Sequence, residues 1–599
     1  MQLLPVALAC LSLPSVSTAV QHGARPPAQA SQPAQTEPVG AAVASDGDLT
    51  AALFEDDATQ QVFVATSDGR ALEFGAPVRI DTDTGGHDKY TGLYFRTTAN
   101  VLQVRGQTIF ATWRDERNAS PGGAGGAEAI DVYFARSVDG GATWDADQPI
   151  PKGFAPGGSS PVQAYSMAVS PSGQDVYVLQ SVLPDFFGGA PRQLRLSESH
   201  DGGVTFSDAV RLVPSADQVY SVSLALDGDT LHVAFTGRIA GGQGNSADVF
   251  HLSSTTGAGG FPATPTQLDP SGDLMWFSDD EVSLAARNGV VALAWPQLDS
   301  IENFYKDLYA AVSTDGGASF GPTTRVGSEP AGTVYLRETT IGVTETGAVV
   351  LAWNDDRNGT FLTDSSVFAS RSVDGGVTWA AEQELSPPGT GYPQLHLDGD
   401  DATLFWRVGL SVSGAFSRDG GVSWSGPIEL DGGNPVNPGP ELDQPSAGYG
   451  ALYNNALGAW VGREDGDPSE LRVFVGGYRL PEVVPPTFTS GANAQVELAS
   501  FSGATPSAWV VFAASPGDLI LPFGDGRNLG LAFDALLAAS LANPTTLLVG
   551  LAPNGSGSTP GFPVSLAPGT ELYAAALSLS LAPTVLVDEI TDVAAIVVE

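Results

Sequence analysis

An eight-residue pattern that occurs five times constrains the fold of this chain more than any other feature of its sequence. The pattern is Ser-x-Asp-Gly-Gly-x-Thr or Ser, followed by Trp or Phe. Its intact copies begin at Ser137, Ser199, Ser313, Ser372 and Ser417. An active site is normally built once, so a pattern repeated in this way indicates a repeated structural unit.

Two degenerate copies extend the series. TSDGRALEF begins at Thr66, and STTGAGGF begins at Ser254 with Thr256 in place of the aspartate. The seven positions are separated by 45 to 71 residues. Between them lie short runs of alternating apolar residues around tight turns, as in Tyr220–Asp269, which is typical of four short antiparallel strands per unit.

Units of this length with four short strands predict an all-β fold, a β-propeller of seven or eight four-stranded blades over residues 38–481. A single unit cannot bury both of its faces, so the units stack radially and close into a ring. Eight of the ten tryptophans recur at two positions of the unit, which indicates packing between blades. Those on the second strand are Trp113, Trp295, Trp353, Trp406 and Trp460, and those that close the octapeptide are Trp144, Trp379 and Trp424.

The sequence changes character after residue 481. Residues 482–599 contain one basic residue, Arg527, and strand-like runs that alternate with Gly and Pro turns. This pattern predicts a separate small C-terminal β-sandwich over residues 482–599.

The N-terminal residues predict export. Residues 1–19 contain an apolar stretch followed by small residues, which is typical of a secretory signal peptide. The single cysteine, Cys10, lies in this segment, and a lipid anchor at Cys10 is the alternative. Residues 20–37 are polar and rich in Pro, so we expect a disordered linker there. We therefore expect a secreted or cell-surface protein without a transmembrane segment.

The net charge of −41 bears on partners. Nucleic acids and anionic membranes need a basic surface, so neither is expected as a partner. We expect a monomer without a cofactor. Calcium is a weaker alternative at four Asp-Gly-Asp turns, which ordinary hairpin turns explain as well. These turns begin at Asp46, Asp227, Asp398 and Asp465.

The octapeptide is similar to the Asp box, or BNR repeat, and its presence makes the chain resemble the sialidase (neuraminidase) superfamily of β-propellers. In that family the Asp boxes lie between the third and fourth strands, away from the active site. The repeated aspartates therefore indicate a fold and not a reaction. The aspartate accepts hydrogen bonds within its own turn, and the two glycines permit the positive φ that the reversal needs.

Candidate site residues lie where units 2 and 6 differ from the others. Unit 2 begins with LYFRTT, which contains Tyr94 and Arg96, and unit 6 begins with VYLRETT, which contains Tyr335, Arg337 and Glu338. The second strands of these units end in TWRDERN and AWNDDRN. These endings contribute Asp115, Arg117, Asp355 and Arg357. In an eight-bladed ring these units lie opposite each other, although the Asp and Arg residues are equally consistent with structural ion pairs.

The resemblance to sialidases implies roles for these residues. Sialidases hold the substrate carboxylate with three arginines, and Arg96 and Arg337 match two of them. The third has no clear match, with Arg238, Arg407 and Arg463 as alternatives. Tyr335 with Glu338 matches the nucleophile pair, and Asp115 matches the acid. The family's Phe-Arg-Ile-Pro motif is only half present here, as Phe95-Arg96.

Trp276, outside both recurring tryptophan positions, is a candidate for stacking on a sugar ring, with a core plug as the alternative. Two functions follow from these patterns. The first is a propeller that acts on glycans, as an exo-glycosidase of the exo-alpha-sialidase type. The second is a non-catalytic surface propeller that binds glycans, glycoproteins or other proteins, and a purely structural surface protein is a third alternative.

Overall fold

The computed structural model describes the chain in segments separated by gaps. The described residues are 28–31, 38–46, 49–68, 74–91, 100–118, 130–156, 160–185, 190–239, 248–269, 282–298, 305–359, 365–408, 411–430, 446–450, 455–463, 471–479, 482–484, 493–494, 496–499, 507–513, 548–550, 557–559, 562–563, 570–580, 586–590 and 594–597. In these segments every regular element is a β-strand except one short 3-10 helix, η1 (Gly257–Gly260).

Eight sheets form the propeller in the described part of the chain, and we number them as blades 1 to 8. Blade 1 contains β2 (Pro38–Asp46), β3 (Leu49–Asp56), β4 (Gln61–Asp68) and β5 (Val78–Arg79), and blade 2 contains β6 (Lys89–Tyr90), β7 (Leu102–Arg105), β8 (Thr108–Asp115), β9 (Asp131–Ser137) and β10 (Gln148–Pro149). Blade 3 contains β11 (Val162–Val169), β12 (Val176–Val182), β13 (Gln193–Ser199) and β14 (Val210–Arg211), and blade 4 contains β15 (Ala216–Asp227), β16 (Thr230–Ile239), β17 (Asp248–Ser254) and β18 (Thr266–Gln267). Blade 5 contains β19 (Ser283–Arg287), β20 (Val290–Leu298), β21 (Lys306–Ser313) and β22 (Thr324–Val326), and blade 6 contains β23 (Leu336–Val343), β24 (Val349–Asp355), β25 (Ser366–Ser372) and β26 (Gln383–Glu384). Blade 7 contains β27 (Thr390–Asp398), β28 (Asp401–Val408), β29 (Ser411–Ser417) and β30 (Ile428–Glu429), and blade 8 contains β31 (Ser446–Gly450), β32 (Asn455–Arg463), β33 (Leu471–Arg479) and β1 (Ala28–Gln29).

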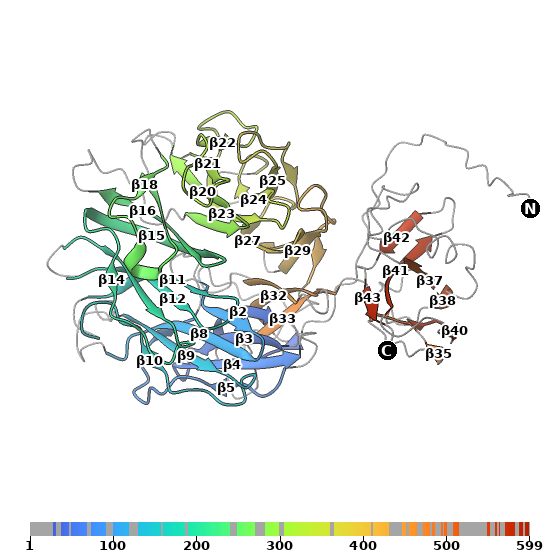
Figure 1. The fold of residues 1–599 in the computed structure, drawn as a ribbon, viewed down its shortest axis with the longest axis horizontal. Helices are drawn as coiled ribbons and strands as arrows, with labels where there is room; N and C mark the ends of the chain where they lie inside the picture. The colour runs from blue at the N-terminus through green and yellow to red at the C-terminus, as the bar shows by residue number, and fades with distance from the viewer. Residues whose placement is uncertain are drawn as a thin grey trace, which may run out of the picture.

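Seven of the described sheets have four strands and the eighth, blade 2, has five. Blade 2 has the extra strand because its inner edge is divided into β6 and β7, which both pair with β8. The sheets follow one another around a ring in chain order, from blue to orange in Figure 1, so that β31, β32 and β33 lie against β2 of the first blade. The predicted all-β propeller is therefore confirmed.

The N-terminal segment departs from the expected disordered linker. β1 pairs antiparallel with β33 and forms the outer edge of blade 8. Ala30 is fully buried, and the Ser31 hydroxyl accepts a hydrogen bond of 2.9 Å from the Val473 amide. The linker prediction is therefore wrong for residues 28–31, because backbone pairing to an open sheet edge orders a segment whose side chains carry little hydrophobic signal.

The octapeptides form the turns from third to fourth strands, as in blade 2 between β9 and β10. The Asp139 carboxylate accepts hydrogen bonds from the Ser137 hydroxyl and from the amide and hydroxyl of Thr143, at 2.8, 2.8 and 2.6 Å. Gly140 and Gly141 have φ of 70° and 88°, in the region that favours glycine. The same bonds recur at Asp201, Asp315, Asp374 and Asp419.

The turn of the degenerate copy in blade 4 is stabilised in a different way. Without an aspartate, the turn after Ser254 forms η1, and Glu198 of blade 3 accepts a hydrogen bond of 2.7 Å from the Ala258 amide. A carboxylate from the neighbouring blade thus replaces the one that the turn has lost.

The tryptophans lie where packing requires them. Trp113, Trp295, Trp353 and Trp406 are among the largest fully buried side chains, while Trp144, Trp379 and Trp424 pack against the cores from their edges. For these seven residues the packing interpretation is confirmed. The side chain of Trp460 lies outside the described part.

The C-terminal region contains three antiparallel sheets in its described segments. The first consists of β34 (Glu482–Val484), β36 (Glu497–Ala499) and β39 (Gly557–Ser558), and the second of β35 (Asn493–Ala494) and β40 (Phe562–Pro563). The third consists of β37 (Ser507–Ala513), β38 (Leu548–Gly550), β41 (Glu571–Ser580), β42 (Leu586–Ile590) and β43 (Ala594–Val597). β34 lies beside β41 and β43, which joins the first of these sheets to the third. Among the described residues, no helix is long and apolar enough to cross a membrane.

Candidate functional site

Each blade has two ends, and the candidate residues lie at one of them. At the end that we call the upper face, the inner strands begin and the second strands stop; the octapeptides lie at the opposite end. Asp115 is the last residue of β8, Asp355 is the last residue of β24, and Glu338 is near the start of β23. The structure therefore brings the described candidates to one face.

Asp115 and Asp355 occupy the same environment in blades 2 and 6. The indole of Trp113 donates a hydrogen bond of 3.1 Å to Asp115, and the indole of Trp353 donates one of 2.9 Å to Asp355. The guanidinium of the arginine two residues later completes each pair, at 2.6 Å for Arg117 and 2.7 Å for Arg357. Both carboxylates are fully buried, with side-chain exposures of 0%.

The two arginines also reach the fourth strand of their own blade. Arg117 forms a second ion pair with Asp147, which precedes β10. Arg357 forms its second with Glu382, which precedes β26. Burial disfavours the charge of Arg117, but the hydrogen bonds and attraction from Asp115 and Asp147 outweigh it and raise the pKa of this arginine.

Each guanidinium lies over an aromatic ring of the third strand, Tyr133 at 3.8 Å for Arg117 and Phe368 at 4.1 Å for Arg357. We call each set of Trp, Asp and Arg a strand-end lock, because it fastens the second strand to the third and fourth. The geometry favours the structural alternative for Asp115, Arg117 and their counterparts in blade 6, since their charged groups already pair within the protein.

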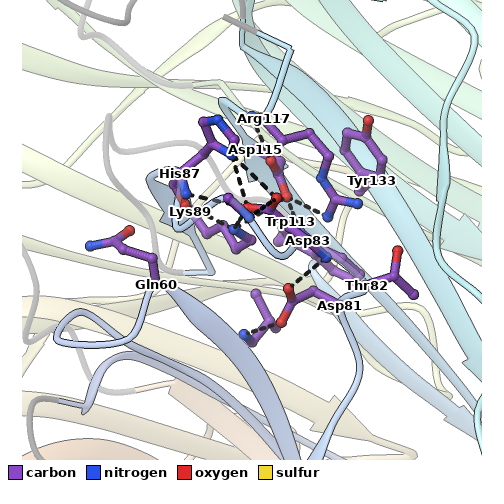
Figure 2. A network of polar contacts seen from close by, with 12 residues as sticks. Gln60, Asp81, Thr82, Asp83, His87, Lys89, Trp113, Asp115, Arg117 and Tyr133 are labelled. Atoms are coloured by element: carbon purple, nitrogen blue, oxygen red, sulfur yellow. Dashed lines mark hydrogen bonds and ion pairs between the residues drawn. The ribbon is translucent and has the colours of Figure 1, made fainter. Parts of the chain in front are cut away.

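Blade 2 extends its lock into a larger buried network (Figure 2). Lys89, on β6, is 2.8 Å from Asp83 and 3.9 Å from Asp115. Asp83 also accepts hydrogen bonds from the Gly85 and His87 amides, at 2.9 and 3.2 Å. Burial alone would raise the pKa of Asp83, but Lys89 and these donors together lower it. The segment that connects blades 1 and 2 is thereby fixed against the end of β8.

Tyr335 and Glu338 do not form the predicted pair. The Tyr335 amide donates a hydrogen bond of 2.8 Å to Asp356, and its ring lies 5.8 Å from the Lys306 ammonium. The Glu338 amide donates to Asn354 at 2.9 Å, but neither carboxylate oxygen of Glu338 has a hydrogen-bond partner within the described structure, although both are shielded from solvent. A carboxylate in this condition requires an explanation.

The remaining predicted residues are not described. Tyr94, Arg96 and Trp276 lie outside the described residues, and so does the side chain of Arg337. Their predicted roles therefore stay predictions.

A second group of polar residues, which the sequence did not single out, lies at the upper face of blades 1 to 3. Glu55, at the end of β3, accepts a hydrogen bond of 2.6 Å from the Thr91 amide. Burial raises the pKa of Glu55 well above its ordinary value, with the charge of Asp57 adding to the effect while Thr91 opposes it. The phenol of Tyr165, on β11, is buried, and burial likewise raises its pKa.

Glu116 belongs to the same group. It is 8% exposed and accepts a hydrogen bond of 3.2 Å from the Tyr90 hydroxyl. Burial raises the pKa of Glu116, the charges of Asp88 and Asp115 raise it further, and Tyr90 and Arg114 oppose them. The sequence contained a signal, because Glu116 lies between Asp115 and Arg117, but the prediction chose the aspartate and the arginine and left out the glutamate.

The aspartates of two Asp-Gly-Asp turns have partners in the described structure. Asp46 accepts a hydrogen bond from the Gly106 amide at 2.7 Å, and Asp227 accepts one from the Gly289 amide at 2.6 Å. These two aspartates fasten hairpin turns to the next blade, in agreement with the hairpin alternative. In the described segments no three or more His, Cys, Asp or Glu side chains group as metal ligands.

Comparison with known proteins gives structural likenesses only. No model of a protein family and no curated protein matches the sequence. Polysaccharide lyase Uly1 is 10% identical, with 67% of this chain and 92% of that chain covered and a TM-score of 0.41. The alpha-L-arabinanase of Penicillium chrysogenum is 14% identical, with coverages of 52% and 92% and a TM-score of 0.34. The Hadza microbial sialidase Hz136 is 17% identical, with coverages of 58% and 71% and a TM-score of 0.31. At these TM-scores no argument about activity rests on the likenesses.

Proposed function

We propose that this chain is an exported propeller that binds glycans at its upper face and hydrolyses them as an exo-glycosidase. The observation that carries the proposal is Glu338, whose two carboxylate oxygens are shielded from solvent and have no hydrogen-bond partner among the described residues. A buried charge without partners is costly, so a ligand that supplies donors is the simplest explanation. Sugar hydroxyls are such donors.

Two carboxyl groups in other blades support the same function. Those of Glu55 and Glu116, at the upper face of blades 1 and 2, have raised pKa values. Glycoside hydrolysis generally uses a pair of carboxyl groups, one of which has to hold a proton near neutral pH. Groups with these properties at one face of a propeller are those that the reaction requires.

The experiment measures binding and hydrolysis separately. Purified protein is applied to a glycan array and to a panel of fluorogenic glycosides that includes a sialoside. Because hydrogen bonds to charged groups contribute about 1.5–3 kcal/mol, Glu338→Gln is expected to weaken glycan binding about 10-fold or more. Glu384→Gln, an exposed carboxylate on β26, is the matched control and is expected to change nothing. Unchanged binding in Glu338→Gln would contradict the proposal.

The sialoside tests the specific version of the proposal. A sialidase of the type expected from the octapeptides needs Arg96 and Arg337 on the substrate carboxylate. Sialoside hydrolysis is then expected to fall steeply in Arg96→Ala and Arg337→Ala. Hydrolysis that survives both substitutions would contradict the arginine assignments and leave a glycosidase of another specificity.

A non-catalytic glycan-binding propeller is the second candidate function. It is favoured by one observation: in the described part of the chain the oxygens of Glu338 accept no hydrogen bond, although the sialidase assignment pairs Glu338 with Tyr335. Binding on the array without release of any fluorogenic group would favour this candidate.

A further inference from the structure

We infer that Glu116 is the proton donor to the glycosidic oxygen in the hydrolysis proposed above, and the inference therefore rests on that proposed function. It assigns a chemical role to a residue that the sialidase resemblance does not match. The argument depends on how Glu116 differs from Asp115, the carboxyl group beside it.

The two carboxyl groups have different partners. Asp115 pairs with Arg117 and Lys89 and accepts the indole hydrogen of Trp113. Glu116 continues the strand pairing through its amide, which donates to the Asp88 carbonyl at 3.0 Å. Within the described structure its carboxyl group forms no ion pair and accepts one hydrogen bond, from the neutral phenol of Tyr90.

In the described structure this difference leaves only one of the two groups without a cation in direct contact. Lys89, Arg117 and the Trp113 indole hold the Asp115 carboxylate in place. Burial and the charges of Asp88 and Asp115 disfavour ionisation of Glu116 and outweigh the opposing effects of Tyr90 and Arg114, so the pKa of Glu116 is raised. Where two neighbouring carboxyl groups have such different environments, the one that retains its proton is the candidate acid.

Tyr90 positions Glu116. Its hydroxyl is 3.2 Å from Oε1, and the Arg114 guanidinium lies 5.6 Å from the centre of the Tyr90 ring. Tyr90 is on β6, whose pairing with β8 holds it beside Arg114. The phenol thus holds Oε1, and we take Oε2 as the atom that passes the proton to the glycosidic oxygen.

The step is a balanced hydrolysis. As the bond between the anomeric carbon and the glycosidic oxygen breaks, the electron pair goes to that oxygen, which takes the proton from Glu116. Water adds its hydroxyl to the anomeric carbon, and the remaining proton of that water returns to the Glu116 carboxylate. The free sugar and the departing alcohol are the products.

The test compares two substrates that share the sugar identified in the panel and differ in the departing group. One releases 2,4-dinitrophenolate, which needs no proton, and the other releases methanol, which does. Because general acid catalysis contributes about 10²–10⁴-fold, Glu116→Gln is expected to lower kcat by that factor for the methyl glycoside and far less for the dinitrophenyl glycoside. Glu384→Gln should leave both rates unchanged.

The pH profile and Tyr90 give independent measurements. Wild-type activity on the methyl glycoside should fall at the alkaline side as Glu116 loses its proton, and this limb should disappear in Glu116→Gln. Tyr90 lowers the pKa of Glu116, so Tyr90→Phe should move the limb to higher pH. A purely structural role for Tyr90 would lower the rate without moving the limb.

Two results overturn the inference, and they differ from each other. If Glu116→Gln lowers kcat equally on both substrates, with the fold and glycan binding intact, Glu116 is not the proton donor, but the proposed glycosidase activity stands. A wild-type protein that binds glycans but hydrolyses no substrate removes the inference together with the hydrolytic half of the proposed function.

Discussion

Blades 2 and 6 carry the same strand-end lock but differ in the residue inside it. In blade 2 that residue is Glu116, whose carboxyl group accepts only the Tyr90 phenol within the described structure. In blade 6 it is Asp356, whose carboxylate accepts the Tyr335 amide at 2.8 Å and so belongs to the backbone scaffold. Blade 6 instead presents Glu338, whose oxygens have no partner in the described part.

The lock that blades 2 and 6 share has a structural role, and we expect function at the carboxyl groups in which the two blades differ. A duplicated unit keeps the interactions that hold it together, whereas a ligand site on the ring does not need to be symmetric. The lock occurs twice with nearly the same distances, while each of the two available carboxyl groups occurs once. Substitutions at the two locks and at Glu116 test this distinction.

The largest effect is expected from breaking the locks. Asp115→Ala or Asp355→Ala leaves a buried arginine without its principal partner, which typically costs about 3–5 kcal/mol. Both variants should lower the free energy of unfolding by similar amounts in urea titrations. A loss below about 1 kcal/mol in either blade would show that the lock is not structural there.

A smaller effect of opposite sign is expected at the neighbouring residue. The pKa of Glu116 is raised in the folded state, so between the unfolded and folded pKa values the folded protein binds more protons and stability falls as pH rises. Glu116→Gln removes this penalty and should raise the free energy of unfolding at neutral pH. The gain should vanish below the unfolded pKa of glutamate, about 4.3. Urea titrations at pH 4 and pH 7 measure it, and a loss of stability at pH 7 would contradict it.

The smallest effect concerns the acceptor of the tryptophan indole. In blade 5 the Trp295 indole donates to Gln297 at 3.2 Å, whereas in blade 7 Val408 holds the corresponding position and the Trp406 nitrogen has no partner in the described structure. The fold thus tolerates an unsatisfied indole at this position of a blade. Gln297→Leu should therefore cost only about 1 kcal/mol, measured by urea titration, and a cost as large as that of Asp355→Ala would contradict this ranking.

The sequence predicted what depends on local pattern. The octapeptide carries its own turn, from the Ser137 hydroxyl to the Thr143 amide, so its spacing predicted the blades. The second-strand tryptophans likewise predicted the packing between blades. At these positions the partners lie within a few residues or follow from strand alternation.

The site was harder to predict because its partners are distant in sequence. Tyr90 is 26 residues from Glu116, and Asp147 approaches Arg117 only through the fourth strand. The charged residues of the lock looked like substrate ligands because nothing local shows that they are already paired. Glu116 was missed for the same reason, since the absence of an ion pair at its carboxyl group in the described structure is visible only in three dimensions.

The strand β1 has a consequence for how the protein assembles. The Ser31 hydroxyl accepts a hydrogen bond from the Val473 amide, 442 residues away, so the last blade takes its outer edge from a segment that is synthesised before the rest of the ring. Contacts of such separation form late, because the cost of closing a long loop precedes the gain. The pairing of β1 with β33 therefore closes the ring late in folding. A chain that stops before residue 471 lacks β33, the strand with which its N-terminal segment pairs.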